Sequence, residues 1–389
     1  MKSAMLKGFN RNMDKKICIF SSFDYYDNIP KGAVEVCHHA IIDDYIKAGY
    51  RVKVCIIPSQ MGKLRMVVGN LKLLLKLFLN IITQKQIVFI YPSIPFIPTT
   101  SVVKYYFAVI VYKIAFLGKR IFNPLIILHI LDYPIEQDKG LNISNVKIKS
   151  LYLFSFEKKL IEDVDYIITY SEPFSKITLE RCWESKEKII QLDFTPVRTH
   201  REMIETKVND SVINYTNNYK TVIFYSGDLG RDYEKNKLSQ LFNEIDETTC
   251  ILLCGNRGDW IKERFHKHNI NYLGYVDSNV HDMLASLCSF GIILYPNKGY
   301  YKVTPTTKLS VYINSLLPVV AITTEANASI FNDYEIGQCI NEESVINTII
   351  EWCKNSTYKD YLPGIKRTYD IINSLRDVNK IKSRIERRV

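Results

Sequence analysis

Short apolar runs, typical of buried strands, alternate with helical patterns along most of the chain. In the first half, strands are expected at 15–21, 51–57, 86–91, 125–130 and 165–170, with helices at 33–48, 64–82, 100–117 and 146–162. This alternation predicts a parallel sheet whose strands are joined by crossover helices. The first half is therefore expected to form one doubly wound α/β domain.

The alternation is interrupted once and then resumes. Residues 195–220 are polar, rich in Asn and Thr and without clear periodicity, which indicates a linker. Strands are expected again at 221–226, 249–254, 269–274, 290–295, 319–323 and 337–340. The predicted organisation is a first domain over 1–194, a linker over 195–220, a second doubly wound domain over 221–365 and a basic helix over 366–389. Such sheets bind ligands beyond the carboxyl ends of their strands, so the chemistry is expected in a cleft between the domains.

The composition fits two folded domains and an anionic partner. With 389 residues, 47% of them hydrophobic and 24% charged, the chain can bury two cores. Its net charge of +10 suggests an anionic partner, such as nucleic acid, a nucleotide, a phosphorylated lipid or an acidic membrane surface, and the alternative is a solvated Lys-rich surface, which explains most of these charges. Nucleic acid is the least expected partner, because the chain contains no recognised nucleic-acid-binding motif. The nine Cys stand mostly in apolar runs, as expected of free thiols in a reducing compartment.

The sequence does not predict a membrane-spanning helix. The opening letters MKSAMLKGFNRNMD lack the apolar stretch of a secretory signal. The most apolar segment, 66–82, falls short of the roughly 20 uncharged residues that a bilayer requires and carries Lys72 and Lys76. Such a helix is expected to be buried or interfacial. We therefore expect a cytoplasmic protein with peripheral attachment to the inner face of the plasma membrane.

Glycine-rich turns follow the first strands of the second half, where a ligand is expected to bind. SGDLGR (226–231) and CGNRGD (254–259) let the backbone approach a phosphate closely, and the Arg of the first turn supplies several donors. A tight turn with a solvated Arg explains the first motif about as well. In GYVD (274–277), exposed backbone groups suit a nucleobase. The donor-binding candidates in these turns are Gly227, Gly230, Arg231, Gly255, Asn256 and Tyr275.

The segment TPTTKLSVYINSLLPVV (304–320) predicts a helix over 305–316 whose first turn has reversed electrostatics. Thr304 is expected as the N-cap and Pro305 as the first helical residue. The first turn contains Lys308 and no acid, although its unpaired N–H groups favour anions. A diphosphate bound at the helix terminus and at Lys308 explains this, and a tolerated surface lysine is the alternative. In both cases we expect Lys308 to be exposed and to contribute little to folding. The helix start adds Thr306, Thr307 and Lys308 to the donor-binding candidates.

The order of these motifs resembles the nucleotide-sugar half of GT-B glycosyltransferases, especially those of family 4. The segment TTKLSVYINSLLPVVA (306–321) is similar to their SKLxEYxAxGxPVVA pattern. In the first half, HILDYPIEQ (129–137) and residues 156–178 are similar to segments of bacterial members. The resemblance covers about residues 15–360 and implies two Rossmann-like domains that face a cleft.

The resemblance also implies a retaining reaction in which basic side chains, not a metal, neutralise the leaving diphosphate. The family's phosphate-contacting residues correspond to Arg231 and Lys308. The chain departs from the family at Val311, where a ribose-binding Glu is common, and at Leu316, where Gly is common. Ribose recognition is therefore expected to differ. No metal and no cofactor other than the sugar nucleotide substrate are expected.

The first domain is expected to bind the acceptor. The loop after its first strand resembles an acceptor loop, and packing of its aromatic residues against the other domain is the alternative. Asp132, after the fourth strand, is a candidate for stabilising positive charge at the sugar carbon or for orienting the acceptor hydroxyl. His129 is a candidate for the same role or for a buried core imidazole. The acceptor-binding candidates are Asp24, Tyr25, Tyr26 and Gly32, and the catalytic candidates are His129, Asp132, Arg231 and Lys308.

The implied function is transfer of a hexose from a nucleoside diphosphate donor, with UDP favoured, to a bacterial surface glycan such as lipopolysaccharide or capsule. The basic first half and segment 66–82 favour a lipid-linked acceptor. One alternative is a sugar-nucleotide 2-epimerase of the same fold, for which the sequence offers no full set of acids and bases. The other is a non-catalytic partner protein of transferase fold, which the departure at Val311 favours.

Overall fold

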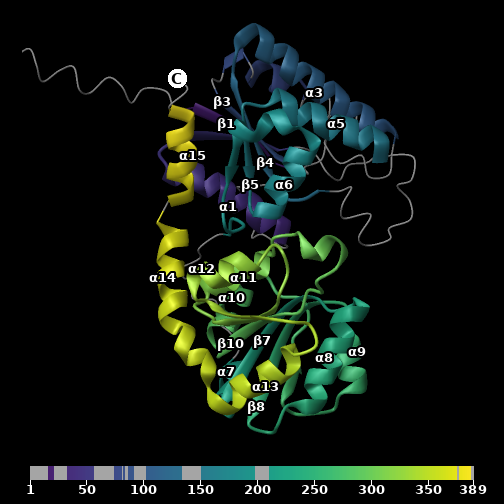
Figure 1. Cartoon of the computed structure of the whole chain (residues 1–389), viewed down its shortest axis with the longest axis vertical. Coiled ribbons are helices and arrows are strands. Elements are labelled where there is room, and N and C mark those ends of the chain that lie inside the picture. Colours follow the sequence, from purple (N-terminus) through teal and green to yellow (C-terminus); the bar gives the residue numbers. More distant parts are fainter. Residues whose placement is uncertain are drawn as a thin grey trace, which may run out of the picture.

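The chain folds into two α/β lobes, one above the other (Figure 1). The computed structural model describes residues 16–21, 33–56, 74–80, 82–83, 86–91, 102–133, 150–197, 210–374 and 376–386. Each lobe contains a six-stranded parallel sheet with helices on its faces, so the predicted pair of doubly wound sheets is confirmed.

The first domain has the strand order β2-β1-β3-β4-β5-β6. Its strands are β1 (Lys16–Ser21), β2 (Arg51–Ile56), β3 (Gln86–Tyr91), β4 (Leu125–Ile130), β5 (Tyr166–Thr169) and β6 (Ile189–Gln191). Its helices are α1 (Ala33–Lys47), α3 (Val102–Phe122), α5 (Ser150–Asp163), α6 (Glu172–Arg181) and the 3₁₀ segment η1 (Trp183–Lys188). Alternate residues of β1 enter two different apolar clusters, Cys18 and Phe20 in one and Ile17 and Ile19 in the other, because successive side chains of a strand point to opposite faces.

The second domain has the strand order β12-β11-β10-β7-β8-β9. Its strands are β7 (Thr221–Asp228), β8 (Thr249–Asn256), β9 (Ile270–Tyr272), β10 (Phe290–Ile293), β11 (Val319–Ile322) and β12 (Gly337–Ile340). Its helices are α7 (Asp210–Asn217), α8 (Asp232–Glu244), α9 (Asp259–Arg264), α10 (Ser278–Ser286), α11 (Thr307–Asn314), α12 (Ala328–Tyr334) and α13 (Val345–Asn355), with 3₁₀ segments η2 (Gly299–Lys302) and η3 (Thr357–Tyr361). Every strand expected from the pattern is present, and β6 is an additional one.

Two expectations about connecting segments are wrong. The segment 195–220 is not a linker throughout, because α7 forms at its end and packs Val212 and Ile213 against the second domain's core. The basic tail is not one helix but two, α14 (Leu362–Asn373) and α15 (Arg376–Glu386). Both segments are mostly polar, and only a narrow stripe of each helix is apolar. The sequence pattern therefore did not reveal α7 or the break between α14 and α15.

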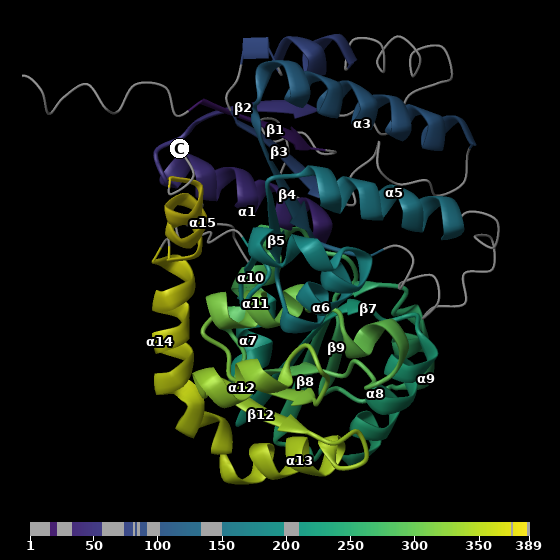
Figure 2. The same ribbon diagram turned by 45° about the horizontal axis from the view of Figure 1, so that its top comes forward.

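Helix α15 returns to the first domain (Figure 2). Ile381 and Ile385 join an apolar cluster of that domain, and Tyr166 Oη donates to the backbone oxygen of Arg384 at 2.9 Å. The Lys380 ammonium donates to the backbone oxygen of Gln191 at 2.6 Å. The chain therefore passes between the domains twice. Among the described helices, none combines the length and apolar character needed to cross a bilayer.

Candidate active site

The glycine-rich turns after β7 and β8 lie side by side at the carboxyl edge of the second sheet. Gly227 is paired in register with Gly255, and Asp228 with Asn256. Both glycines have positive φ, 144° and 136°. A Cβ on Gly227 would lie 2.8 Å from the Cε and Nζ atoms of Lys308, and one on Gly255 would lie 1.8 Å from the oxygen of Gly227. The two glycines therefore permit a close approach of two turns and one lysine.

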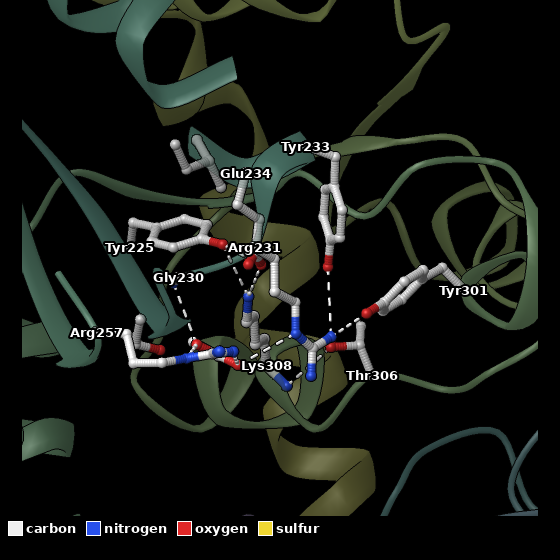
Figure 3. Close-up of polar contacts among 12 residues, drawn as sticks. Tyr225, Gly230, Arg231, Tyr233, Glu234, Arg257, Tyr301, Thr306 and Lys308 are labelled. Carbon is white, nitrogen blue, oxygen red and sulfur yellow. Dashed lines mark hydrogen bonds and ion pairs between the residues drawn. The ribbon is translucent and has the colours of Figure 1, made fainter. Parts of the chain in front are cut away.

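Arg231 extends from the first of these turns, immediately before helix α8 (Figure 3). Its Nε atom donates to Asp228 Oδ2 at 3.2 Å, and its Nη1 atom donates to the hydroxyls of Tyr233, at 3.5 Å, and Tyr301. Its side chain is 34% exposed. The guanidinium is thus fixed in direction yet open to a ligand.

Arg257 is a second cation at this edge, and the sequence analysis missed it. Its guanidinium makes a two-pronged contact with the Asp228 carboxylate, through Nε at 2.7 Å and through Nη2, and its side chain is 61% exposed. Its backbone has a left-handed φ of 59°, which is strained for a residue with a side chain. A Cβ on Gly230 would lie within 2.6 Å of Arg257 Nε, so the glycine is needed where the arginine crosses the turn. Arg257 could have been proposed from the sequence, because it stands in the glycine-rich turn CGNRGD as Arg231 stands in SGDLGR.

Lys308 is buried, so the expectation of an exposed lysine is wrong. Its side chain is 9% exposed, and Nζ lies 3.4 Å from Glu234 Oε1 and donates to Tyr225 Oη at 3.2 Å. Nζ also lies 4.4 Å and 4.6 Å from the ring centroids of Tyr225 and Tyr295. Burial alone lowers the pKa of Lys308, but Tyr295 and Glu234 outweigh this and raise the pKa above the ordinary value. The first turn of α11 tolerates a cation because its carboxylate partner comes from α8.

The start of helix α11 differs from the expected one by two residues. Thr306, not Thr304, is the N-cap, and its Oγ1 atom accepts a hydrogen bond from the backbone N of Lys308 at 3.3 Å. Thr307 is then the first helical residue, and Pro305 lies outside the helix. Leu316, at the position where the resemblance places a Gly, adopts a left-handed φ of 57° just after the helix. A residue with a side chain thus occupies a backbone conformation that favours glycine.

These side chains form a cluster with a small positive excess. Arg231, Arg257 and Lys308 carry three positive charges, and Asp228 and Glu234 carry two negative ones, which leaves +1. The two arginines share one partly exposed aspartate, whereas Lys308 and Glu234 form a buried pair. An incoming anion can therefore reach the arginines directly, but Lys308 only through a rearrangement.

The remaining donor-binding candidates lie near this edge. Asn256 is exposed, and its backbone oxygen accepts from Leu229 N at 2.9 Å. Tyr275 is exposed after β9, next to Gly274, whose oxygen accepts from Gly255 N at 2.8 Å. The pKa of Tyr275 is raised by burial and by the Glu35 carboxylate of the first domain. Tyr275 is thus placed where the two domains face each other.

His129 occupies the first domain's core, as the alternative reading of this residue anticipated. Its Nε2 atom lies 3.0 Å from Tyr45 Oη and its Nδ1 atom 2.6 Å from Tyr170 Oη, and the residue is 2% exposed. Burial and the neighbouring His38 lower its pKa to about 3, so the ring is neutral. Both ring nitrogens are engaged by tyrosines, and the structure does not bring His129 to the cation cluster.

Asp132, by contrast, lies where the first domain meets the second. Its Oδ1 atom accepts from the backbone N of Tyr133 at 3.0 Å, and the same N–H also donates to Tyr300 Oη of the second domain at 3.3 Å. Burial raises the pKa of Asp132 to about 7, despite the opposing hydrogen bond from Tyr133. The Asp132 side chain is half-buried, and with this pKa its carboxyl is close to its titration midpoint at neutral pH.

The candidate acceptor residues Asp24, Tyr25, Tyr26 and Gly32 lie outside the described residues. Within the described part of the chain, no group of three or more His, Cys, Asp or Glu side chains is arranged to hold a metal ion. At this edge the structure displays a cluster of two arginines, a lysine and glycine-rich turns, a combination that suits an anion.

Comparison with known proteins relates the domain that carries this site to a described family. Residues 223–380, which include the whole cation cluster, match the family described as "Glucosyltransferase 3-like, C-terminal domain". The second domain is thus similar to a glucosyltransferase domain, and the two domains together have the GT-B fold. A comparison with curated protein sequences found no match.

Solved structures with a similar fold match this chain across both domains. The sucrose-phosphate synthase of Thermosynechococcus elongatus is similar with a TM-score of 0.65 and 11% identity, over 97% of this chain and 100% of that one. HepE of Anabaena, in complex with UDP and glucose, has a TM-score of 0.58 and 14% identity, over 96% and 98% of the two chains. WaaG, a glycosyltransferase involved in lipopolysaccharide biosynthesis, has a TM-score of 0.58 and 10% identity, over 94% and 98%.

Proposed function

We propose that the protein transfers a hexose, with glucose the first candidate, from a UDP-sugar to a glycan acceptor of a bacterial surface polysaccharide, with retention of configuration. The observation that carries the proposal is the pair of accessible guanidinium groups, Arg231 and Arg257, on glycine-rich turns at the carboxyl edge of the second sheet. The glucosyltransferase family model and the UDP complexes of HepE support a UDP-glucose donor. WaaG supports lipopolysaccharide as the kind of product.

In this proposal the donor's diphosphate displaces Asp228 as the partner of the two arginines. Guanidinium groups then hold the phosphates by paired, charge-assisted hydrogen bonds, and they stabilise the charge that develops on UDP as it leaves. The buried ammonium of Lys308, which lies against Gly227, adds positive electrostatic potential at the diphosphate. Asp132 acts from the first domain, where its ionised form orients the acceptor hydroxyl or stabilises positive charge at the sugar carbon. No metal ion is required, because the side chains supply the positive charge.

The proposal is tested by incubating the protein with UDP-glucose, UDP-galactose and other UDP-sugars, with and without a bacterial glycolipid extract as acceptor. We expect release of UDP, stimulated by the extract and retained in EDTA. Formation of a new sugar nucleotide without UDP release indicates the 2-epimerase. Absence of any turnover, with every donor and extract, favours the non-catalytic partner. Loss of activity in EDTA that manganese or magnesium restores contradicts the metal-free reaction.

An exposed apolar and basic face of the first domain supports a lipid-linked acceptor. Helix α3 and the helical segment 74–80 both pack into one apolar cluster, through Phe116 and Leu77. Both figures show α3 on the side of the first domain that is remote from the second. Large apolar side chains on the outer faces of these helices and the adjoining segment are exposed: Leu75, Phe78, Leu79, Ile82, Ile110, Leu117, Ile121 and Phe122. Exposed Lys76, Lys113 and Arg120 lie among them, a combination that suits an anionic membrane.

We expect binding to vesicles containing anionic lipid, and we expect this binding to weaken as salt increases. The double variant Lys113→Glu with Arg120→Glu reverses two of these charges. It should lower vesicle affinity by at least about 30-fold, since each cation near the surface contributes about 1 kcal/mol. Sedimentation with vesicles measures this. The matched control is Lys359→Glu with Lys366→Glu, two exposed lysines of the second domain, which should bind as the wild type does. Membrane retention after a high-salt wash, with release only by detergent, contradicts the electrostatic mode.

A further inference from the structure

The 3₁₀ turn η2 contacts the first domain and the cation cluster at the same time. It follows β10 and precedes α11, and its two middle residues, Tyr300 and Tyr301, are only 5% and 8% exposed. In a 3₁₀ turn successive side chains are about 120° apart, so neighbours in sequence can face different surroundings. Neither tyrosine was singled out from the sequence.

Tyr300 is packed into the first domain, although the chain places it in the second. It belongs to the apolar cluster on one face of the first sheet, and its ring centroid lies 6.5 Å from that of Phe174. Its Oη atom accepts the hydrogen bond from Tyr133 N, the same N–H that bonds Asp132. Tyr300 therefore contacts the strand end that carries the acceptor-side carboxyl.

Tyr301 faces the other way and contacts Arg231. Its Oη atom accepts a hydrogen bond from Arg231 Nη1, and the guanidinium carbon lies 5.4 Å from its ring centroid (Figure 3). Its ring packs against those of Tyr233 and Tyr295, each at a centroid distance of 5.0 Å. The second domain also holds the end of the turn, because Ala326 N donates to the backbone oxygen of Lys302 at 3.1 Å. The direction of the Arg231 guanidinium thus depends on where η2 lies.

We propose that η2 couples the seating of the first domain to the orientation of Arg231, with Tyr300 and Tyr301 as positioning residues. The inference rests on the proposed function, in which Arg231 holds the donor's diphosphate. Two adjacent residues of one turn do not move independently, and withdrawing either ring exposes a large aromatic surface. When the first domain moves away, Tyr300 loses its contacts with Phe174 and Tyr133. Tyr301 then shifts with it, and the Arg231 guanidinium loses its fixed direction. Donor cleavage is thereby confined to the arrangement in which the acceptor domain is in place.

A double-mutant cycle with Arg231 tests the coupling. Tyr300→Ala is expected to lower kcat for UDP release by about 10-fold in the wild-type background but by less than about 2-fold in the Arg231→Ala background, since a residue that acts through Arg231 has nothing further to lose. Tyr301→Phe removes only the hydroxyl and keeps the buried ring, so folding is preserved. It is expected to show the same pattern with a smaller loss. The same cycle on UDP affinity, measured by calorimetry, requires no turnover.

Tyr219→Ala is the matched control. Tyr219 follows α7, and its hydroxyl donates to the backbone oxygen of His268, in the same domain, at 3.2 Å. It belongs neither to η2 nor to the cation cluster, so its effect should be the same in both backgrounds. Equal effects of Tyr300→Ala, or of Tyr301→Phe, with and without Arg231 overturn the coupling. A wild type that releases no UDP contradicts the proposed function instead, and the cycle on UDP affinity then decides the coupling.

Discussion

Arg231→Ala is expected to lower kcat by roughly 100-fold or more, the size of effect seen when one well-placed electrostatic donor is removed from a transition state. Arg231 is the cation that combines a fixed direction with an accessible guanidinium, through Asp228, Tyr233 and Tyr301. Folding should change little, because the side chain is partly exposed and Asp228 keeps Arg257 as its partner. Steady-state UDP release and a thermal melt measure the two effects.

Two variants sharpen this result. Arg231→Lys keeps the charge but loses the forked geometry, so an intermediate kcat is expected. Arg367→Ala removes an arginine of the same domain that pairs with Glu335, and it should leave kcat unchanged. An Arg231→Ala protein with kcat within about threefold of the wild type would show that the guanidinium does not serve the leaving group.

Lys308→Ala is expected to destabilise the second domain by about 3–5 kcal/mol, because it leaves a buried carboxylate without its counter-ion. Glu234 is 1% exposed, its Oε1 atom receives both the Lys308 contact and a hydrogen bond from Tyr225, and its Oε2 atom has no hydrogen-bond partner in the described part of the chain. Urea titration should therefore show a lower free energy of unfolding for Lys308→Ala than for the wild type. This measurement is made first, because a loss of activity can be assigned to catalysis only in protein that remains folded.

The double variant Lys308→Met with Glu234→Gln should recover most of that stability, since no buried charge is left unpaired. Lys302→Ala is the matched control, because its ion pair with Glu325 is exposed and should contribute less than about 1 kcal/mol. If Lys308→Ala unfolds at the same urea concentration as the wild type, the buried pair does not stabilise the fold. If the double variant is stable but inactive, the ammonium serves catalysis as well.

The sequence predicted what depends on local pattern. Apolar runs between polar segments marked the strands, and glycine-rich letters after 221–226 and 249–254 marked the turns that bring Gly227 beside Gly255. The order of strands along the chain was sufficient to predict two parallel sheets, which the structure confirms. Arg231 could be proposed as a site residue because it follows a predicted strand. That position can be identified from the sequence without knowing which residues of other segments contact it.

The sequence did not predict what depends on distant contacts. Lys308 looked exposed because its counter-ion, Glu234, lies 74 residues earlier. Tyr300 and Tyr301 were adjacent letters in a polar loop, and only the packed domains show that one faces Phe174 and the other Arg231. The N-cap was misplaced by two residues because TPTT offers three threonines, and the choice depends on backbone geometry.

The return of α15 to the first domain limits how the cleft can open. The chain leaves the first domain after β6 and returns to it at α15, where Ile381 and Ile385 are buried in the first domain. Moving the first domain away from the second would therefore either pull α15 from these contacts or bend the chain between α14 and α15, which follow each other closely in sequence. We expect the domains to move relative to each other by bending at this junction, with α15 kept on the first domain.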